Sequence, residues 1–466
     1  MQQKWLQLKY FSTYVHKLDT IKNIYFIGIG GIGMSALARY FVSKGCTVSG
    51  YDKTKTILTE ALSELGINIH YEDNTGLIDT KADVVVYTPA IPASHSELNY
   101  FRDNGYEVVK RSDILGWITE GTVNICVAGT HGKTTVSTMV AHLLRDSGYG
   151  CTAFLGGIAA NYNTNFWSSD NNVVVVEADE YDRSFLKLNP SVAVVTSMDA
   201  DHLDIYKTAE AFEDAFVSFS EKVKPGGLLL AKKGLAREAS FDASTLVTYS
   251  LNGNGASIYA KDIRVVNGAY HFTVVGPSWQ LEEMVLNMGG LHNIENALVA
   301  VAVAVHLGIE SQKIRAALAN FAGVKRRFEY LIKTDAQVLI DDYAHHPAEL
   351  AALISGVRSL YPAQKLTLVF QPHLFSRTQD LCDGFAASLS AADEVVLLPI
   401  YPARELPIPG VTSEMIIGKM TNKNVVLLQK EELSAWVKAE APKLLVMAGA
   451  GDIDVLIRNI KNDLIQ

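Results

Sequence analysis

The sequence is poor in cysteine, in long apolar runs and in excess positive charge. Its 466 residues contain four cysteines, Cys46, Cys126, Cys151 and Cys382, which lie far apart and form no Cys-x-x-Cys pair. We therefore expect no disulfide framework and no zinc cage, and we expect a reducing, cytoplasmic setting. No stretch approaches 18 uninterrupted apolar residues, and residues 1–20 lack a continuous apolar core. Neither membrane insertion nor a signal peptide is expected.

The charge balance argues against a nucleic-acid partner. The chain has 41 Lys and Arg against 50 Asp and Glu, a formal net charge of −9, whereas nucleic-acid surfaces need clustered cations. An acidic substrate must then be bound by local cationic loops. A hydrophobic content of 48% with 20% charged residues is ordinary for a globular protein, and the length predicts two to four domains.

One glycine-containing stretch organises the central part of the chain. It is Gly129-Thr130-His131-Gly132-Lys133-Thr134-Thr135, which follows the β-type run 123–128 and precedes a helical pattern at 136–144. Strand, glycine turn and helix are the context of a phosphate-binding loop. The glycines let several backbone N–H groups face one anion, and the helix start adds its positive dipole end. Lys133 is expected to reach the terminal phosphates, and the Thr134 hydroxyl a bound Mg²⁺.

The match to the usual phosphate-loop pattern is imperfect. That pattern places a glycine five residues before Gly132, where this chain has Val127. The structural alternative is a tight strand-to-helix turn with a solvated lysine.

A second glycine loop lies near the start of the chain. Gly28, Gly30 and Gly33 follow the apolar run 23–27, and Asp52 ends the next strand-like run. This is the spacing of a dinucleotide fingerprint, with an acid about twenty residues after the glycines. The pattern fits NAD, FAD or a nucleotide-sugar diphosphate equally, and a tight turn without a ligand is the structural alternative.

Two apolar runs in the central part end in acidic residues. Run 172–176 leads into Glu177-Ala178-Asp179-Glu180, and run 191–196 leads into Ser197-Met198-Asp199-Ala200-Asp201-His202. Buried parallel strands deliver such residues to one edge of a sheet, where ligands collect. Glu177 has the position of a carboxylate that holds Mg²⁺. His202 is a candidate ligand of a second metal, although imidazole is an unusual partner for Mg²⁺.

The remaining sequence predicts an antiparallel portion and a further α/β unit. Residues 225–285 contain Gly and Asn turns and are expected to form hairpins that cover the sheet. Asn293 and Asn296 then lie on one face of a helix start, where Asn293 is either a helix cap or, with Asn296, a nucleotide contact. After residue 326, apolar runs at 337–340, 366–370, 394–398 and 444–447 alternate with helical stretches.

Together these motifs resemble the Mur ligases, the ATP-dependent amide-forming enzymes of peptidoglycan synthesis. The resemblance covers about residues 22–460 and is carried by residues 129–135, 177–180, 199–202, 292–296, Arg-Arg-Phe-Glu (326–329) and Asp-Asp-Tyr-Ala-His-His-Pro (341–347). Residues 28–38, 371–378 and 401–405 are similar to the branch of the family that adds L-alanine. No lysine occurs between Lys207 and Lys222, where several family members carry a carbamylated lysine near the second metal.

The resemblance implies an α/β chain of three domains. After an N-terminal extension (1–21), it implies a Rossmann-like domain for the UDP-sugar (22–121). A central P-loop ATPase-like domain with a parallel sheet and an antiparallel part (122–326) follows, and then a C-terminal Rossmann-like ligase domain (327–466). The implied reaction joins L-alanine to UDP-N-acetylmuramate through an acyl phosphate, with ATP converted to ADP and phosphate.

The resemblance also assigns roles to residues. It implies catalytic roles for Lys133, Glu177, His202, Arg327, Asp342 and His346. It implies ATP contacts from Gly129, Thr130, His131, Gly132, Lys133, Thr134, Thr135, Asn293, Asn296, Arg327 and Asp342. It places the UDP-sugar on Gly28, Gly30, Gly31, Gly33 and Asp52, and the amino acid and acyl phosphate near Tyr343, His345, His373 and Arg377. Mg²⁺, two ions in all, is expected on Thr134, Glu177 and His202.

Three other functions remain open at this stage. A ligase that recycles a whole peptide onto the same sugar nucleotide shares the phosphate loop and the motif at 341–347. A Rossmann oxidoreductase built on residues 24–52 leaves the phosphate loop unexplained. A catalytically silent nucleotide-binding protein is disfavoured by the presence of Lys133, Glu177 and His202.

Overall fold

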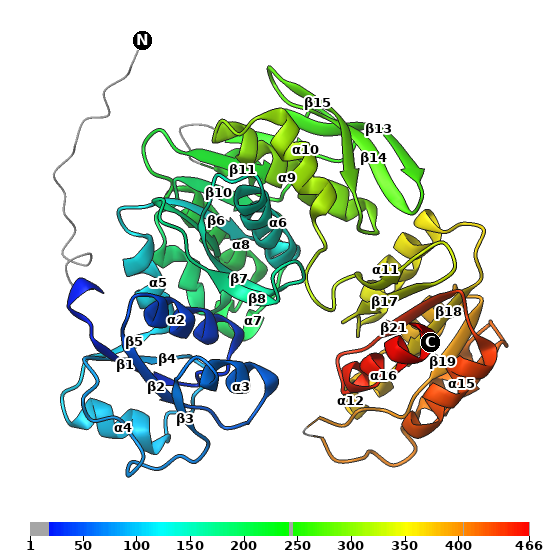
Figure 1. Cartoon of the computed structure of the whole chain (residues 1–466), viewed down its shortest axis with the longest axis horizontal. Coiled ribbons are helices and arrows are strands. Elements are labelled where there is room, and N and C mark those ends of the chain that lie inside the picture. The colour runs from blue at the N-terminus through cyan, green and yellow to red at the C-terminus, as the bar shows by residue number, and fades with distance from the viewer. Residues whose placement is uncertain (1–17, 242–245, 404, 466) are drawn as a thin grey trace.

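A computed structural model describes residues 18–241, 246–403 and 405–465. Most of the expected N-terminal extension, and residue 404 of the stretch 401–405, lie outside the described residues. Figure 1 shows three α/β units, coloured blue, cyan to green, and yellow to red along the chain. Among the described residues, no helix is long and apolar enough to cross a membrane.

The first unit is a parallel sheet of five strands with the order β3-β2-β1-β4-β5. Its strands are β1 (Asn23–Ile27), β2 (Thr47–Tyr51), β3 (Asn68–His70), β4 (Val84–Tyr87) and β5 (Val108–Lys110). Its helices are α2 (Ile32–Ser43), α3 (Ile57–Ser63), α4 (Ser96–Asp103) and α5 (Arg111–Thr119).

The central unit is a sheet of ten strands with the order β15-β14-β13-β12-β11-β10-β6-β9-β7-β8. Its strands are β6 (Val123–Ala128), β7 (Thr152–Ala159), β8 (Thr164–Trp167), β9 (Val173–Glu177), β10 (Val192–Val195), β11 (Leu228–Lys232), β12 (Leu246–Ser250), β13 (Ile258–Val266), β14 (Ala269–Val275) and β15 (Gln280–Leu286). Its helices are α6 (Lys133–Asp146), η1 (Tyr181–Lys187), α7 (Leu203–Tyr206), α8 (Ala209–Ser220), η2 (Glu238–Ser240), α9 (Leu291–His306) and α10 (Ser311–Asn320).

The third unit is a sheet of six strands with the order β16-β17-β21-β18-β19-β20, parallel except for β16. Its strands are β16 (Glu329–Lys333), β17 (Val338–Asp342), β18 (Leu366–Phe370), β19 (Glu394–Leu397), β20 (Val425–Leu427) and β21 (Leu444–Ala448). Its helices are α11 (Pro347–Leu360), α12 (Phe375–Asp380), α13 (Cys382–Leu389), α14 (Ser413–Lys419), η3 (Lys430–Glu432), α15 (Leu433–Glu440) and α16 (Ile453–Ile465).

These sheets confirm the predicted α/β fold, in which a central parallel sheet carries an antiparallel part. The expectation of hairpins throughout 225–285 is wrong for its first half. Strands β11 and β12 are parallel to their neighbours, and only β13, β14 and β15 pair antiparallel there. The turn at Pro225-Gly226 leads from the crossover helix α8 into the parallel strand β11. Proline and glycine suit this connection as well as a hairpin turn, so they do not distinguish the two. The antiparallel strands extend the sheet at its edge and do not cover it.

Apolar cores run across the boundaries between units. One buried cluster joins Phe41 of α2 to Phe154 of β7 and continues into α8. The Tyr40 ring also contacts Phe154, with 5.5 Å between ring centroids. A second cluster joins the α9 region to α11 of the third unit. The first and third units therefore pack on different parts of the central unit, and Figure 1 shows them as separate units.

Helix α8 provides a test of how strongly this core depends on aromatic packing. Phe216 is fully buried, and its ring lies 5.2 Å from Phe212 and 5.1 Å from Phe185. We expect Phe216→Ala to lower the free energy of unfolding by about 3–5 kcal/mol, since it leaves a cavity beside the sheet. Urea denaturation is the measurement. The control is Val455→Ala on α16, where Val455 is 64% exposed. This variant should change the free energy of unfolding by less than about 0.5 kcal/mol. Equal effects of the two would contradict this account of the core.

Candidate active site

The phosphate loop joins β6 to α6 and is braced by the chain that follows β10. Gly129 and Gly132 have φ values of 136° and 82°, which side chains rarely adopt. The Thr130 hydroxyl donates to the Asp199 carbonyl at 2.7 Å, and the His131 N–H donates to the Ser197 hydroxyl at 2.7 Å. Helix α6 begins at Lys133, where its start is expected, and Gly132 caps it in the left-handed conformation. Thr135 is buried in the first turn.

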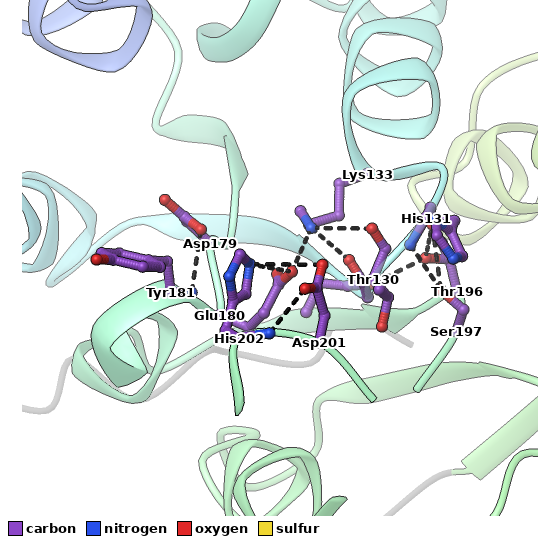
Figure 2. Close-up of polar contacts among 12 residues, drawn as sticks. Thr130, His131, Lys133, Asp179, Glu180, Tyr181, Thr196, Ser197, Asp201 and His202 are labelled. Atoms are coloured by element: carbon purple, nitrogen blue, oxygen red, sulfur yellow. Dashed lines mark hydrogen bonds and ion pairs between the residues drawn. The ribbon is translucent and has the colours of Figure 1, made fainter. Parts of the chain in front are cut away.

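Lys133 lies at the centre of the candidate site (Figure 2). Its ammonium donates to the Gly129 carbonyl at 2.6 Å and to Glu180 Oε1 at 2.7 Å. Glu180 is 1% exposed, and its second carboxylate oxygen has no hydrogen-bond partner. Burial raises the pKa of Glu180, and the charge of Lys133 opposes that rise. Sequence reasoning did not single out Glu180 as a site residue, although it ends the acidic motif after β9.

Glu177 and Thr134 lie together, as the sequence predicts. Glu177 ends β9, accepts a hydrogen bond from the Gly156 N–H at 3.1 Å and pairs with the Thr134 hydroxyl. Burial raises the pKa of Glu177, while the Thr134 hydroxyl and the charges of Lys133 and Arg327 lower it. The Thr134 hydroxyl and the Glu177 carboxylate supply hard oxygen ligands beside the phosphate loop. This donor set fits Mg²⁺.

His202 lies on the Glu180 side of the site. Its Nε2 is 3.8 Å from Glu180 Oε1 and 3.7 Å from Asp201 Oδ2, and its ring meets Tyr181 edge-on. The backbone of His202 has φ of 52°, so the chain turns sharply where it presents the imidazole. In the part of the chain that the structure describes, no three His, Cys, Asp or Glu side chains form a group able to hold a metal ion.

The two asparagines of α9 differ in what they contact. Asn296 faces the phosphate loop: its Oδ1 lies 3.2 Å from the point where a Cβ on Gly132 would be. Asn293 is buried and donates to the Gly289 carbonyl at 2.6 Å. The capping alternative for Asn293 is wrong, because the helix is capped at Gly290 without a side-chain hydrogen bond. Asn293 instead accepts from the Asn296 amide at 3.0 Å and orients it.

Arg327 lies on the segment that joins the central unit to the third unit, and Asp342 ends β17 of the third unit. The connecting segment pairs with β7 through the hydrogen bond from Lys325 N–H to the Ile158 carbonyl at 2.9 Å. Arg327 is exposed, and its charge lowers the pKa of both Glu177 and Asp342. Burial nevertheless raises the pKa of Asp342 to about 6, although N–H groups of Phe328 and Ala344 donate to it at 2.7 and 2.8 Å. One cation thus acts on carboxylates of two units.

The predicted amino-acid side forms its own cluster in the third unit. The rings of His345 and His373 are 6.3 Å apart, and Arg377 lies 3.4 Å from His373 Nδ1. Burial and the nearby charges of Arg377 and His345 lower the pKa of His373. Tyr343 meets His345 edge-on at 5.2 Å. Four predicted residues thus gather here, and Tyr401 stacks on His373 as a further member that the prediction omitted.

His346 occupies a different place. It is exposed and caps α11, with its Nδ1 accepting from the Ala348 N–H at 3.3 Å. A catalytic role for His346 stays a prediction.

The N-terminal glycine loop faces the central unit across a cavity of about 380 Å³. Gly31 and Gly33 line it on one side, and Glu177 lines it on the other. Asp52 accepts hydrogen bonds from the Gly30 N–H at 2.7 Å and the Thr54 N–H at 3.1 Å, so its carboxylate closes the loop. Gly28 has φ of 87° and donates its N–H to the Tyr51 carbonyl at 2.8 Å. The cavity connects the first glycine loop to the phosphate-loop acids.

A single methyl group tests whether the position of Glu177 matters. A Cβ on Gly156 would overlap the Glu177 carboxylate, while the backbone there is acceptable to alanine. We expect Gly156→Ala to displace that carboxylate and to lower kcat by about 10²-fold, the size of effect that a misplaced group produces. The matched control is Gly418→Ala on α14, where a Cβ has open space. Steady-state phosphate release is the measurement, and wild-type turnover by the Gly156 variant would show that Glu177 is not needed where it lies.

Comparison with known proteins gives a consistent result along the chain. Three family models match: "Mur ligase family, catalytic domain" at residues 23–122, "Mur ligase middle domain" at 127–304 and "Mur ligase, glutamate ligase domain" at 326–453. A Flavobacterium johnsoniae protein named UDP-N-acetylmuramate--L-alanine ligase is 50% identical, covering 95% of this chain and 98% of its own length. A Parabacteroides distasonis protein of the same name is 49% identical, with 95% and 97% covered. The crystal structure of UDP-N-acetylmuramate-alanine ligase MurC from Thermotoga maritima has a TM-score of 0.80 and 27% identity, with 95% and 98% covered. The three family models, matched one after another along the chain, and the relatives of about 50% identity show that the chain belongs to the Mur ligase family.

Proposed function

We propose that this chain joins L-alanine to the lactyl carboxylate of UDP-N-acetylmuramate, with ATP converted to ADP and phosphate, as a cytoplasmic step of peptidoglycan synthesis. The observation that carries the proposal is the arrangement of Lys133, Thr134 and Glu177 at one phosphate loop, with Glu180 paired to Lys133. Curated relatives that are 46–50% identical over at least 95% of the chain carry the name of this activity. The four free cysteines agree with a reducing compartment.

The chemistry needs a carboxylate to become an acyl donor. The lactyl carboxylate attacks the γ-phosphorus of ATP, the bond to the bridging oxygen breaks, and ADP leaves. The amine of alanine then attacks the acyl phosphate and phosphate leaves, so that an amide is formed. Both steps develop negative charge on phosphoryl oxygens, which positioned cations stabilise.

The described side chains suit these tasks. Lys133, released from Glu180, is placed to meet the terminal phosphates, and the loop N–H groups cradle them. Arg327 supplies a second positive charge from the segment that leads into the third unit. Asn296 faces the loop from α9. The cluster of His345, His373 and Arg377 offers the polar surroundings for the amino acid.

Mg²⁺ is part of the proposal. Thr134 and Glu177 would hold one ion, and His202 a second, where the metal would neutralise charge on the phosphates. Mg²⁺ is usually held by one or two protein oxygens together with phosphate oxygens and water, which agrees with the small number of protein ligands gathered here. The domain boundaries 22–121, 122–326 and 327–466 belong to the same proposal, one domain for each substrate.

The two alternative functions have less support. A murein peptide ligase from Psychrobacter arcticus has a TM-score of 0.63 but 23% identity, which shows a shared fold alone. A Rossmann oxidoreductase accounts for neither the phosphate loop nor the arrangement around Lys133.

One prediction of the proposed function concerns the amino acid substrate. With UDP-N-acetylmuramate, ATP and Mg²⁺, phosphate release should depend on L-alanine, with glycine and serine as the best competitors. A pocket shaped for one methyl group discriminates by about 1–3 kcal/mol, a factor of about 10–200. A panel of amino acids and the L-alanyl tripeptide in the same assay is the measurement. Preference for the tripeptide, or for a large or charged amino acid, would refute the alanine assignment.

The second prediction concerns the loop lysine. Lys133→Ala should lower phosphate release by at least about 10²-fold, because the transferring phosphoryl group loses its nearest cation. Binding of UDP-N-acetylmuramate should be largely unchanged, since the sugar-nucleotide loop is in another unit. Near wild-type turnover by this variant would be incompatible with the assignment of the phosphate loop.

A further inference from the structure

Arg111 is a cation in the cavity between the first and central units, and it has no role in the proposed reaction. Of the described residues that line this cavity, Arg111 is the only lysine or arginine. It is the first residue of α5, directly after β5, and its side chain is 20% exposed. The cavity has about 380 Å³, which suits part of a nucleotide-sized ligand.

The guanidinium of Arg111 is held against the N-terminal glycine loop. Its Nη1 lies 2.9 Å from the point where a Cβ on Gly33 would be, and its Cδ lies 3.2 Å from that point. Gly33 is in the first turn of α2, a helix of 12 residues whose cap, Gly31, makes no side-chain hydrogen bond. The first N–H groups of a helix lack acceptors within the helix and favour anions. A planar cation and a helix start therefore face the same space.

Asp179 of the central unit fixes the other side of the guanidinium. Arg111 Nη2 donates to Asp179 Oδ2 at 3.0 Å. Two further ion pairs run beside it between the same elements, Lys110 with Asp182 at 2.5 Å and Asp113 with Lys187. Asp179 contacts Nη2, whereas Nη1 is the nitrogen beside Gly33. The guanidinium is thus oriented by a carboxylate while its other edge is turned to the glycine loop.

We propose that Arg111 binds the diphosphate of the sugar nucleotide, together with the N–H groups at the start of α2, and that Asp179 is its positioning residue. This inference rests on the proposed function, because it assumes a UDP-sugar on the glycine loop. A guanidinium forms paired, charge-assisted hydrogen bonds with phosphate oxygens. The lactyl carboxylate is the rival anionic partner for Arg111, and UDP-N-acetylglucosamine, which lacks that carboxylate, distinguishes the two.

The consequence is that one acidic motif contributes residues to both sides of the cavity. Asp179 is two residues from Glu177 and next to Glu180, which holds the loop lysine. The carboxylate that positions Arg111 on the sugar-nucleotide side therefore belongs to the same acidic motif as the carboxylates of the ATP side. The diphosphate is bound across the boundary of two units, not by the first unit alone.

The test is calorimetric binding to the full chain without ATP. The three probes are UDP, UDP-N-acetylglucosamine, which lacks the lactyl carboxylate, and UDP-N-acetylmuramate. Arg111→Met should weaken all three by a similar factor of about 10–100, the usual loss for a hydrogen bond to a charged group. Arg111→Lys should recover part of the affinity, since the charge stays but the planar fork is lost. Lys110→Met is the matched control, because it removes a neighbouring ion pair outside the cavity, and it should bind all three probes as wild type does.

Asp179→Asn tests the positioning role separately. It should raise the KM for UDP-N-acetylmuramate severalfold and leave the KM for ATP unchanged, because Arg111 is still present but less well held. Each variant is also tested for binding of a non-hydrolysable ATP analogue, which shows that the central unit is folded.

Three results would overturn the inference. They are unchanged UDP binding by Arg111→Met, a loss confined to UDP-N-acetylmuramate, which would assign Arg111 to the carboxylate, and an equal loss in Lys110→Met. Wild-type protein that binds none of the three probes would refute the proposed function itself and the inference with it.

Discussion

The structure depends on how one positive charge is balanced at the carboxyl edge of the central sheet. Lys133 is surrounded by loop carbonyl groups and by the buried carboxylate of Glu180, with Glu177 beyond it. Burying these carboxylates is unfavourable unless a cation compensates, which is why burial raises the pKa of both. The strands β6, β9 and β10 bring these groups together because they are parallel neighbours.

The other two units are arranged around this balance. The segment before β16 pairs with β7, so Arg327 lies near Glu177 even though the chain is about to enter the third unit. Asp342 ends β17 and is held by the N–H of Phe328 in that segment. On the opposite side, α2 and α5 of the first unit contact β7 and η1. The first and third units are therefore both attached to the central unit next to β7.

Much of this was predictable from sequence. The run 123–128 is a strand with the expected bounds, and the buried runs near 173 and 192 are strands too, because β-branched residues without alternation mark strands buried on both faces. The acidic residues that follow these strands lie at the carboxyl edge of the sheet, as the parallel topology predicts. Pro225 and Gly226 led to the wrong prediction of a hairpin, because their turn leads to a parallel strand. Glu180, Gly156 and Arg111 were not identified, since their importance comes from contacts with residues distant in sequence. The local reading of Asn293 as a cap failed because its amide is committed to Gly289.

The contact between the second and third units has a geometric consequence. Gly356 on α11 approaches Gly290 so closely that a Cβ on it would lie 2.9 Å from the Gly290 backbone nitrogen. Two stretches of main chain meet there directly, inside the buried cluster that joins the α9 region to α11. Gly290 also precedes the helix that carries Asn296. A side chain at position 356 would therefore push on the same turn of chain that presents Asn296 to the phosphate loop.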